Sequence, residues 1–281
     1  MKLVTPSFSD IMEPNITIKR FPDGDNYIKL PDVIDSKQVI LFHRLWPEQD
    51  SALVQAFLIL STLKKAGVKT TVVFPYLPYS RQDKIFKEGE TLSAEEICRL
   101  LDYAGAERLV TFDCHFLKKE GEFGYGGLKI ANISMAEKLI AHAKALVNGE
   151  PLEIISPDVG THYMVEQHCG NSMKKVRGQY RSGTEAYREI ESMEGSFEVK
   201  DKNVLIIDDI IGAGGTMLRA VENLKKNGAK RILCAATHGL FLKDSMIKLQ
   251  EACNSVFVSD SVNTSLSQVK IAEILKKKGY L

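Results

Sequence analysis

Two adjacent carboxylates followed by a glycine-rich turn form the stretch of this sequence best suited to chemistry. Residues 204–216 read VLIIDDIIGAGGT. Glycines at the start of a helix let backbone N–H groups surround a phosphate, and neighbouring carboxylates can accept hydrogen bonds from the hydroxyls of a ribose. We therefore predict a sugar-phosphate site made up of Asp208, Asp209, Gly212, Ala213, Gly214, Gly215 and Thr216.

Two familiar phosphate-binding patterns do not describe this turn. A Walker loop ends in Gly-Lys-Ser/Thr, whereas the turn ends in Gly-Gly-Thr followed by Met217 and offers no lysine to a second phosphate. In a dinucleotide fingerprint the acidic residue lies about 20 residues after the glycines, not just before them. A turn with a purely structural role is the alternative. Two consecutive carboxylates after four apolar residues count against it.

A second polar cluster, YSRQDK at residues 79–84, follows the apolar run TTVVFPYL. Arg81 offers a fixed fork of donors for phosphate, and Gln82 and Asp83 can contact a base or a ribose. A solvated charged loop is the alternative interpretation. The cluster therefore predicts nucleotide binding only in combination with other signals.

Further candidates end two other apolar runs. Asp113 and His115 close RLVTFDCH, where the histidine can bind a metal or a nucleotide phosphate, or simply form ordinary hydrogen bonds. Asp158 follows LEIIS in the sequence SPDVG and can supply an oxygen ligand to Mg²⁺. The same residues are also typical of a plain turn.

Two polar stretches complete the candidates. Residues 174–177 read KKVR and lead into a glycine-containing stretch, a combination that can close cations over a polyphosphate, although most basic loops are only solvated surface. Residues 21–25 read FPDGD, which is typical of a turn. Phe21 beside that turn can stack on a base.

The elements that position these clusters repeat one pattern. Residues 63–77, 101–115 and 224–238 each read as a helix that ends at a glycine, followed by a strand. This pattern predicts parallel sheets in two similar α/β domains. With turn residues NGEP at 148–151, we expect the domains at residues 1–146 and 147–281. Ligands of such sheets bind beyond the carboxyl ends of the strands, where the polar clusters fall.

Composition narrows the functional class. Among 281 residues, 37 Lys and Arg balance 36 Asp and Glu, so nothing indicates a nucleic-acid partner. The most apolar helical run, residues 52–60, is far shorter than the roughly 20 residues of a membrane span. The N-terminal residues lack the apolar core of a signal peptide. Five widely spaced cysteines indicate neither a disulfide framework nor a zinc site, so we expect a cytoplasmic protein.

Taken together and in order, the motifs FPDGD, YSRQDK, DCH, SPDVG, K-x-R and DDIIGAGGT resemble those of the ribose-phosphate diphosphokinase (PRPP synthetase) family. The resemblance runs from about Arg20 to about Val262, and the ending THGLF with NSVFVSDSV resembles its short archaeal-type members. It implies two domains of the type I phosphoribosyltransferase fold. It also implies a reaction of ATP with ribose 5-phosphate that gives AMP and 5-phosphoribosyl 1-diphosphate, with Mg²⁺ as the cofactor.

The resemblance also assigns roles to residues. Lys175 and Arg177 match the catalytic K-x-R, and His115 and Asp158 would serve the metal. Asp23 and Asp25 would reach the adenine site of a neighbouring subunit, which implies at least a homodimer. The residues expected to contact ATP are Phe21, Asp23, Gly24, Asp25, Arg81, Gln82, Asp83 and His115.

This sequence departs from the family pattern at several positions. Gly212 and Ala213 replace an acidic residue and a threonine of the phosphate loop, which removes a hydroxyl contact and predicts weaker binding of ribose 5-phosphate. Asp25 stands where glutamate is usual, and Thr161 where a second glycine is usual. The segment before the K-x-R motif is short, so either Lys174 or Lys175 can be the catalytic lysine; the spacing to Arg177 favours Lys175.

Two other functions share part of this pattern. A phosphoribosyltransferase that consumes PRPP would have the same DDIIGAGGT loop but would not need the ATP residues. A regulatory relative that binds both substrates with little turnover would have no need of the K-x-R cations. The ordered set of motifs favours the diphosphokinase.

Overall fold

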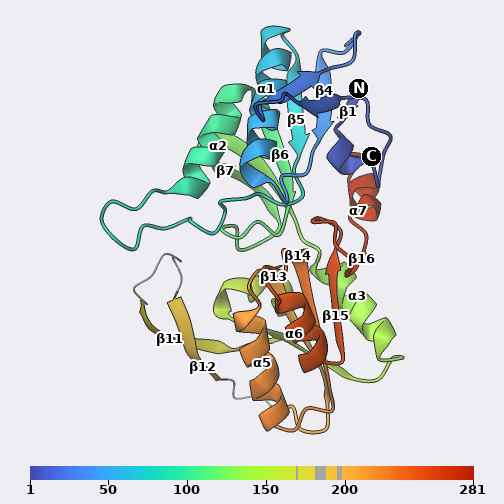
Figure 1. Ribbon diagram of the computed structural model, residues 1–281. Helices are drawn as coiled ribbons and strands as arrows, with labels where there is room; N and C mark the ends of the chain where they lie inside the picture. The colour runs from blue at the N-terminus through green and yellow to red at the C-terminus, as the bar shows by residue number, and fades with distance from the viewer. Residues whose placement is uncertain (169, 181–187, 195–197) are drawn as a thin grey trace. The chain divides into compact units, whose positions relative to one another are not determined.

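The computed structural model describes residues 1–168, 170–180, 188–194 and 198–281, with only the backbone described for 174–180 and 188–194. The chain forms two compact units. We call Met1–Ile133 together with Ala272–Leu281 the N-terminal unit, and Ser134–Ile271 the C-terminal unit. Figure 1 shows the elements of each unit. None of the described helices is long and apolar enough to cross a membrane.

The N-terminal unit is built on a six-stranded sheet in the order β1-β4-β5-β6-β8-β7, in which only the edge strand β7 is antiparallel. Its strands are β1 (Lys2–Val4), β4 (Gln38–Phe42), β5 (Lys69–Val73), β6 (Ala106–Phe112), β7 (Gly121–Tyr125) and β8 (Leu128–Ile133). Its helices are η1 (Pro6–Phe8), α1 (Gln49–Lys65), α2 (Ser93–Ala104) and α7 (Ala272–Lys277). A separate hairpin of β2 (Thr17–Arg20) and β3 (Asn26–Lys29) packs beside α1.

Local chemistry explains how these elements begin and end. Helix α2 ends at Gly105, whose φ of 118° lies in the left-handed region and whose N–H bonds to the carbonyl oxygens of Leu101 and Asp102. Helix α1 buries Leu53, Ala56, Leu60 and Leu63 at helical spacing against the sheet. Strands β5 and β6 follow these two helices, so the first two helix–glycine–strand segments form parallel neighbours in one sheet.

The C-terminal unit has an entirely parallel six-stranded sheet in the order β10-β9-β13-β14-β15-β16. Its strands are β9 (Leu152–Ser156), β10 (Asn171–Ser172), β13 (Asn203–Ile211), β14 (Arg231–Gly239), β15 (Ser255–Ser259) and β16 (Ser267–Val269). Its helices are α3 (Ala136–Leu146), η2 (Val159–Thr161), α4 (Tyr163–Glu166), α5 (Gly215–Lys226) and α6 (Ser245–Ala252). Strands β11 (Lys174–Tyr180) and β12 (Arg188–Glu194) form an antiparallel pair apart from this sheet.

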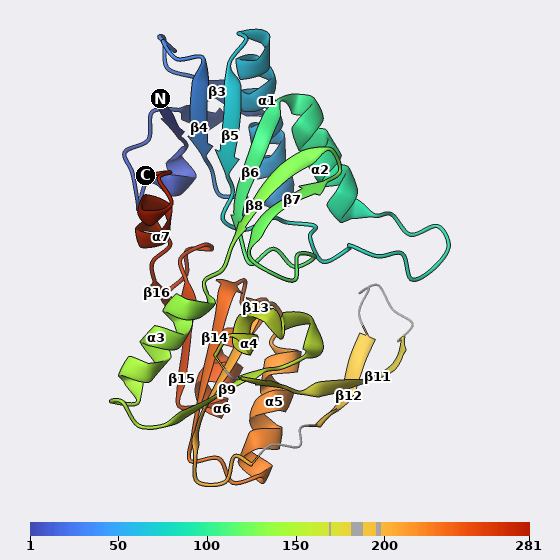
Figure 2. The same cartoon turned by 180° about the vertical axis from the view of Figure 1, so that it is seen from behind.

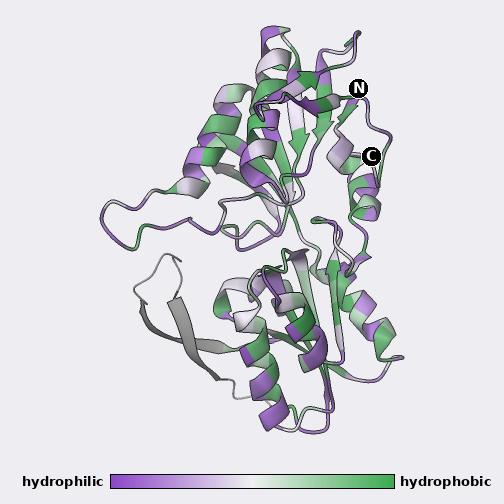
Figure 3. Ribbon diagram, viewed as in Figure 1, coloured by the Kyte–Doolittle hydropathy of each residue, from purple (hydrophilic) through white to green (hydrophobic). Residues whose placement is uncertain are grey.

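The core of the C-terminal unit lies on both faces of its sheet. Figures 1 and 2 show α5 and α6 over one face and α3 over the other. All nine residues of β13 are buried, as expected for a central parallel strand covered on both sides. Figure 3 shows apolar sheet strands between helices whose outer sides are hydrophilic. The sheets of both units are parallel cores of α/β type, as the sequence predicts.

The units divide the chain at a different place from the turn expected at residues 148–151. Helix α3 precedes that turn, yet it packs beside β13 and β14 and buries Leu139, Ile140 and Ala143 there. The division therefore falls before α3, and the C-terminal helix α7 returns to the N-terminal unit. Both features depend on packing between segments distant in the sequence.

Candidate functional site

The glycine-rich turn joins the carboxyl end of β13 to the start of α5. Gly214 has a φ of 77° and is the N-cap of the helix, and a Cβ there would lie 2.9 Å from the Cβ of Ser245. Around Gly215 there is open space, since a Cβ would meet no atom within 4 Å. The first N–H groups of a helix have no partner within the helix, so α5 directs donors to this turn.

Helix α6 supports the turn from behind. The hydroxyl of Ser245 donates to the carbonyl oxygen of Gly212 (3.0 Å), and the N–H of Leu242 donates to the same oxygen (3.1 Å). Both bonds therefore fix the carbonyl oxygen of Gly212. Ala213 is exposed, and its side chain brings no hydrogen-bonding group to the loop.

The two carboxylates lie within β13 and not beyond its end. The strand continues to Ile211, with Asp208 opposite Ala236 and Ile210 opposite His238 in β14. Both aspartates are buried, and the N–H of Asp209 donates to Oδ1 of Asp208 (3.1 Å). Because successive strand residues point to opposite faces, the two carboxylates do not share one face of the sheet.

Asp208 is the carboxylate on the side of α5. Val204 and Ile206 precede it at two-residue spacing and belong to the apolar cluster that also contains Met217 and Val221 of α5. Asp208 therefore has the better position for a ligand held at the start of that helix. The sequence could not distinguish the two aspartates.

Asp158 lies in the turn after β9. Its Oδ1 atom accepts hydrogen bonds from the N–H groups of Gly160 (2.6 Å) and Thr161 (3.3 Å), which caps the short helix η2. Thr161 is buried, and its hydroxyl donates to the carbonyl oxygen of Asp158 (3.4 Å). Since β9 and β13 are parallel neighbours, this turn lies at the same sheet edge as the glycine-rich turn.

A chain of polar side chains joins this turn to the start of β11. The hydroxyl oxygens of Ser156 and Ser172 lie 2.7 Å apart, and Ser172 Oγ lies 2.6 Å from Nδ1 of His162. The Ser156 hydroxyl also lies 2.9 Å from the carbonyl oxygen of Asp158. Ser172 ends β10, and β11 begins shortly after it at Lys174. The chain of contacts therefore fixes the backbone from which β11 departs.

Lys175 and Arg177 lie on β11, whose pair with β12 extends away from the sheet in Figure 1. The register of the pair shifts between Val176 and Arg177. The side chains of β11 lie outside the part of the chain that the structure describes. The catalytic role of Lys175 and Arg177 stays a prediction.

In the N-terminal unit the YSRQDK cluster follows β5 and is anchored to the start of α2. The hydroxyl of Ser93 donates to Oε1 of Gln82 (2.6 Å), and the N–H of Ala94 donates to the Gln82 carbonyl oxygen (3.2 Å). Tyr79 has a φ of 64° and hydrogen-bonds to Asp50, and this bond raises the pKa of Tyr79.

The side chains of this cluster differ in exposure. The side chain of Arg81 is exposed, whereas Gln82 and Asp83 are half-buried. The cluster is thus a fixed turn that presents a cation to solvent.

His115 lies in the loop after β6, the parallel neighbour of β5. Buried Asn132 of β8 fixes this loop, because its Oδ1 accepts from the N–H of Cys114 (2.8 Å) and its Nδ2 donates to the Lys119 carbonyl oxygen (2.9 Å). Asp113 has a φ of 32°, an unfavourable conformation for a residue other than glycine. His115 and the YSRQDK cluster therefore follow adjacent strands and share one sheet edge.

FPDGD forms the turn of the β2–β3 hairpin, as its composition predicts. The N–H of Phe21 bonds to the carbonyl oxygen of Asp25 (2.8 Å), and the N–H of Asp25 bonds to Oδ1 of Asp23 (3.1 Å). Phe21 is 50% exposed and packs edge-to-face on Tyr27. The described contacts hold this turn to its own hairpin and bring neither Arg81 nor His115 to it.

Comparison with known protein families distinguishes two of the functions left open by the sequence. Residues 9–105 match the family model of the N-terminal domain of ribose phosphate pyrophosphokinase, and residues 134–273 match that of the phosphoribosyl transferase domain. The chain is 35% identical to the ribose-phosphate pyrophosphokinase of Pyrococcus abyssi, across 94% of this chain and 90% of that one. The corresponding Methanopyrus kandleri protein is 31% identical, across 90% and 86%.

This chain belongs to the ribose-phosphate pyrophosphokinase family. The match to the N-terminal domain of that family sets it apart from a phosphoribosyltransferase that consumes PRPP, because the glycine-rich loop alone does not distinguish them. The phosphoribosylpyrophosphate synthetase of Mycobacterium smegmatis, at 22% identity, has the same fold, with a TM-score of 0.74 over 99% of this chain and 96% of that chain. The predicted type I phosphoribosyltransferase-like fold is confirmed.

The metal predicted for a ribose-phosphate pyrophosphokinase needs few protein ligands. Among the described residues, no three His, Cys, Asp or Glu side chains gather to form a metal site. Mg²⁺ usually takes one or two carboxylates and completes its shell with water and substrate phosphates. The roles of Asp158 and His115 as metal ligands stay predictions.

Sequence reasoning missed the residues that support the ribose-phosphate pyrophosphokinase motifs. Asn132, Ser172, His162 and Ser245 hold the loops that carry the predicted site, but the local sequence around each one does not indicate which loop it supports. Only the tertiary structure shows which backbone each one contacts. A polar residue within an apolar strand, such as Asn132 in LKIANI, is the one signal that was available.

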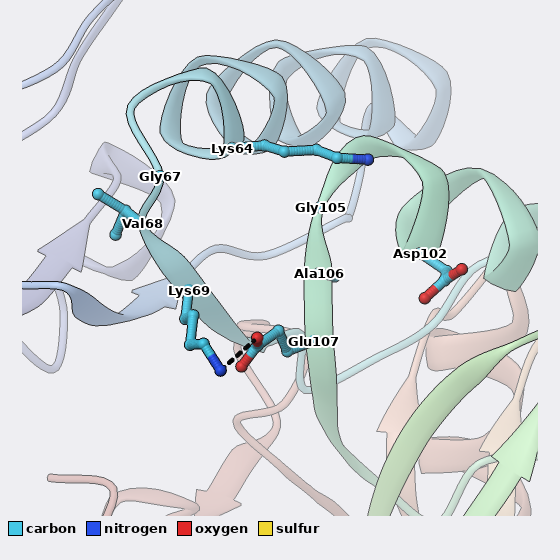
Figure 4. Close-up of a pocket in the computed structure, with 8 residues that line it drawn as sticks. All are labelled: Lys64, Gly67, Val68, Lys69, Asp102, Gly105, Ala106 and Glu107. Carbon is cyan, nitrogen blue, oxygen red and sulfur yellow. Dashed lines mark ion pairs between the residues drawn. The ribbon is translucent and has the colours of Figure 1, made fainter.

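Two pockets lie outside these loops. One pocket, of about 290 Å³, lies at the amino-terminal ends of β5 and β6 (Figure 4). There Nζ of Lys69 forms an ion pair with Oε1 of Glu107 at 3.3 Å. This is the opposite sheet edge from the one that binds ligands in parallel sheets. The second, of about 480 Å³, lies between α1 and the β2–β3 hairpin, beside Phe21. Neither pocket contains Arg81, His115 or the glycine-rich turn.

Proposed function

We propose that this chain transfers the β,γ-diphosphoryl group of MgATP to the C1 hydroxyl of ribose 5-phosphate, which gives PRPP and AMP. Membership of the ribose-phosphate pyrophosphokinase family supports this reaction. The single observation that carries the proposal is the pair of matches, in which a ribose-phosphate pyrophosphokinase N-terminal domain precedes a phosphoribosyl transferase domain.

Ribose 5-phosphate is assigned to the C-terminal unit. The 5-phosphate would accept hydrogen bonds from the N–H groups of the turn 212–216 and of the first turn of α5. Asp208, on the α5 side of β13, would accept hydrogen bonds from the ribose hydroxyls. Asp209 would assist by orienting the Asp208 carboxylate, because its N–H already donates to Oδ1 of Asp208.

ATP is assigned to the N-terminal unit. Arg81 would bind a phosphate, and Gln82 and Asp83 would contact the nucleotide beside it. His115 lies at the end of the adjacent strand. Phe21, Asp23, Gly24 and Asp25 would contact the adenine of a second copy of the chain, so the active form would be at least a homodimer.

The chemistry demands alignment and charge neutralisation more than covalent participation. The C1 hydroxyl attacks the β-phosphorus, and negative charge develops on the departing AMP. Lys175 and Arg177 would stabilise that charge, and removal of one such donor in a water-excluded site typically raises the barrier by about 3 to 4 kcal/mol. His115 of the N-terminal unit and Asp158 of the C-terminal unit are each a candidate ligand of Mg²⁺, and the ion would supply electrostatic stabilisation of the transferred group.

Phosphorus NMR of the protein with ATP, Mg²⁺ and ribose 5-phosphate tests this function. We expect AMP and a sugar-linked diphosphate to appear together. Lys175→Ala should abolish the product signals, and Lys174→Ala should leave them largely intact if Lys175 is the catalytic lysine. Binding of both substrates without any product in the unaltered protein would instead indicate a regulatory relative.

A further inference from the structure

The turn that presents Arg81 is anchored to two helices of the N-terminal unit. The N–H of Gln82 donates to the carbonyl oxygen of Tyr79 (3.1 Å) and closes the turn. The Gln82 end is bonded to the start of α2 through the hydroxyl of Ser93. At the other end, the hydroxyl of Tyr79 donates to Oδ1 of Asp50 in the first turn of α1. Arg81 is exposed between these two attachments.

Tyr79 has a backbone conformation that needs support. Its φ of 64° lies in the left-handed region, which is unfavourable for a residue with a bulky side chain. Such a conformation persists only where surrounding contacts hold it. Tyr79 is 41% exposed, whereas the next residue, Ser80, is buried. The bond from the Tyr79 hydroxyl to Asp50 is therefore one of the contacts that keep the turn in this conformation.

Asp50 belongs to a firmly packed part of α1. Leu53 and Ala56, on the next turn of the helix, are buried in the core of the N-terminal unit. The carbonyl oxygen of Ala52 lies 3.0 Å from Nε2 of buried His43. The Asp50 side chain is exposed, and a carboxylate is favourable at this end of a helix. A well-packed helix thus supplies the acceptor for the Tyr79 hydroxyl.

We propose that Asp50 is a positioning residue for ATP, which acts through Tyr79 on Arg81. This inference rests on the proposed function, in which Arg81 binds a phosphate of ATP. A turn that is ordered before the nucleotide arrives loses less conformational entropy when the nucleotide binds. Asp50 itself does not touch the nucleotide and has no part in the chemical step. Loss of its hydrogen bond should therefore weaken ATP binding and leave kcat unchanged.

The sign of the effect separates positioning from simple electrostatics. A carboxylate near a phosphate-binding arginine opposes the binding of an anion, so removal of its charge alone would strengthen ATP binding. Removal of the hydrogen bond would weaken ATP binding. Asp50→Asn removes the charge and keeps Oδ1 as an acceptor, whereas Asp50→Ala removes both. The two variants therefore distinguish the two effects.

Calorimetric titration with MgATP, combined with steady-state kinetics, tests the proposal. Asp50→Ala should raise the dissociation constant of MgATP about fivefold, the scale of one lost hydrogen bond, and Asp50→Asn should stay within about twofold of the parent protein. Tyr79→Phe should show the same loss as Asp50→Ala. The double variant should lose no more than either single variant, because the bond can be broken only once. The kcat and the KM for ribose 5-phosphate should not change.

Glu137→Ala is the matched control. Glu137 is an exposed acidic residue in the first turn of α3, in the C-terminal unit. Its replacement repeats the loss of a carboxylate at the start of a helix and leaves the bond between Asp50 and Tyr79 in place. Glu137→Ala should therefore bind MgATP like the parent protein.

Unchanged or tighter binding of MgATP by Asp50→Ala would overturn the proposal, as would losses that multiply in the double variant. A lower melting temperature with equal loss of affinity for both substrates would indicate a general structural role and would also overturn it. If the parent protein forms PRPP while Asp50→Ala binds MgATP normally, only the positioning role is refuted. If Asp50→Ala shows the expected loss but the parent protein forms no PRPP, the positioning role is supported and the proposed function is refuted. A parent protein that does not bind MgATP would refute both.

Discussion

The hydroxyl oxygens of Ser156 and Ser172 lie 2.7 Å apart and join the turn that contains Asp158 to the strand that leads to Lys175. Ser156 ends β9, and Ser172 ends the neighbouring parallel strand β10. The contact therefore couples two parts of the proposed site that are separated in the sequence. We therefore expect Ser172 to act as a positioning residue that does not itself touch a substrate.

Ser172→Ala is expected to lower kcat about fivefold, the equivalent of about 1 kcal/mol for one lost hydrogen bond. Because the variant removes the link to β11 and not a substrate contact, the KM for ribose 5-phosphate should change little. Steady-state kinetics check this, with Ser265→Ala at an exposed position as the matched control. Unchanged kcat in a normally folded Ser172→Ala protein would refute the positioning role.

We expect alanine substitutions at two glycines of the turn to differ in effect: one lowers stability and the other weakens binding of ribose 5-phosphate. Gly214→Ala should destabilise the protein by about 1 to 2 kcal/mol, because its φ of 77° strains an alanine and the new Cβ would meet Ser245 at 2.9 Å. Gly215→Ala should preserve stability, since open space surrounds it, but should raise the KM for ribose 5-phosphate by crowding the phosphate. Denaturant unfolding and kinetics of both variants test this; equal loss of stability in the two would contradict it.

A hydroxyl added to the exposed Ala213 should strengthen phosphate binding. We expect Ala213→Thr to lower the KM for ribose 5-phosphate about fivefold, the gain from one additional hydrogen bond. Ala213→Val has nearly the same shape without the hydroxyl and should show no gain. An unchanged KM in Ala213→Thr would show that the missing hydroxyl does not weaken binding.

We expect Asn132 to affect both stability and ATP binding, although it is not one of the residues expected to contact ATP. Asn132→Ala removes both bonds that fix the loop after β6, and it leaves the buried N–H of Cys114 without its acceptor. The expected loss of stability is about 2 to 3 kcal/mol, with a raised KM for ATP because His115 lies in that loop. Chemical denaturation and ATP kinetics provide the test. A variant with wild-type values of both would contradict this account.

Acid should destabilise the N-terminal unit through His43. Burial lowers the pKa of His43 to about 4. In the folded protein its Nδ1 lies 2.9 Å from the Thr5 hydroxyl and its Nε2 lies 3.0 Å from the Ala52 carbonyl oxygen. In the unfolded chain His43 binds a proton near pH 6.5, whereas in the folded protein it stays neutral down to about pH 4. The free energy of unfolding is therefore highest above pH 6.5 and decreases as the pH falls toward 4. Between pH 7.5 and 5 the expected loss is about 2 kcal/mol.

The pH dependence is measured by denaturant unfolding at several pH values. His43→Gln retains a side-chain donor but does not titrate, so its unfolding free energy should fall less than that of the parent protein over the same range. Parallel pH profiles for the two proteins would show that His43 is not responsible.

Local sequence chemistry predicted much of the fold and the strand ends that carry the candidate site. The helix that ends at Gly105 and the apolar strand that contains Asp208 follow from residue types close together in the chain. The division of the units before Ala136 could not be predicted, because an amphipathic helix beside a turn does not indicate which sheet it will cover. Likewise, the placement of Asp208 and not Asp209 beside α5 depends on which face of β13 that helix covers. The supporting contacts of Ser172 are tertiary and leave no local pattern.

The most direct test of diphosphoryl transfer follows the β-phosphate. The protein is given Mg²⁺, ribose 5-phosphate and ATP labelled at the β-phosphorus, and the products are separated. We predict that all of the transferred label appears in PRPP and that the AMP is unlabelled. Label in ADP would indicate transfer of the γ-phosphate alone, and label in free pyrophosphate would indicate hydrolysis; either result would contradict the proposed function.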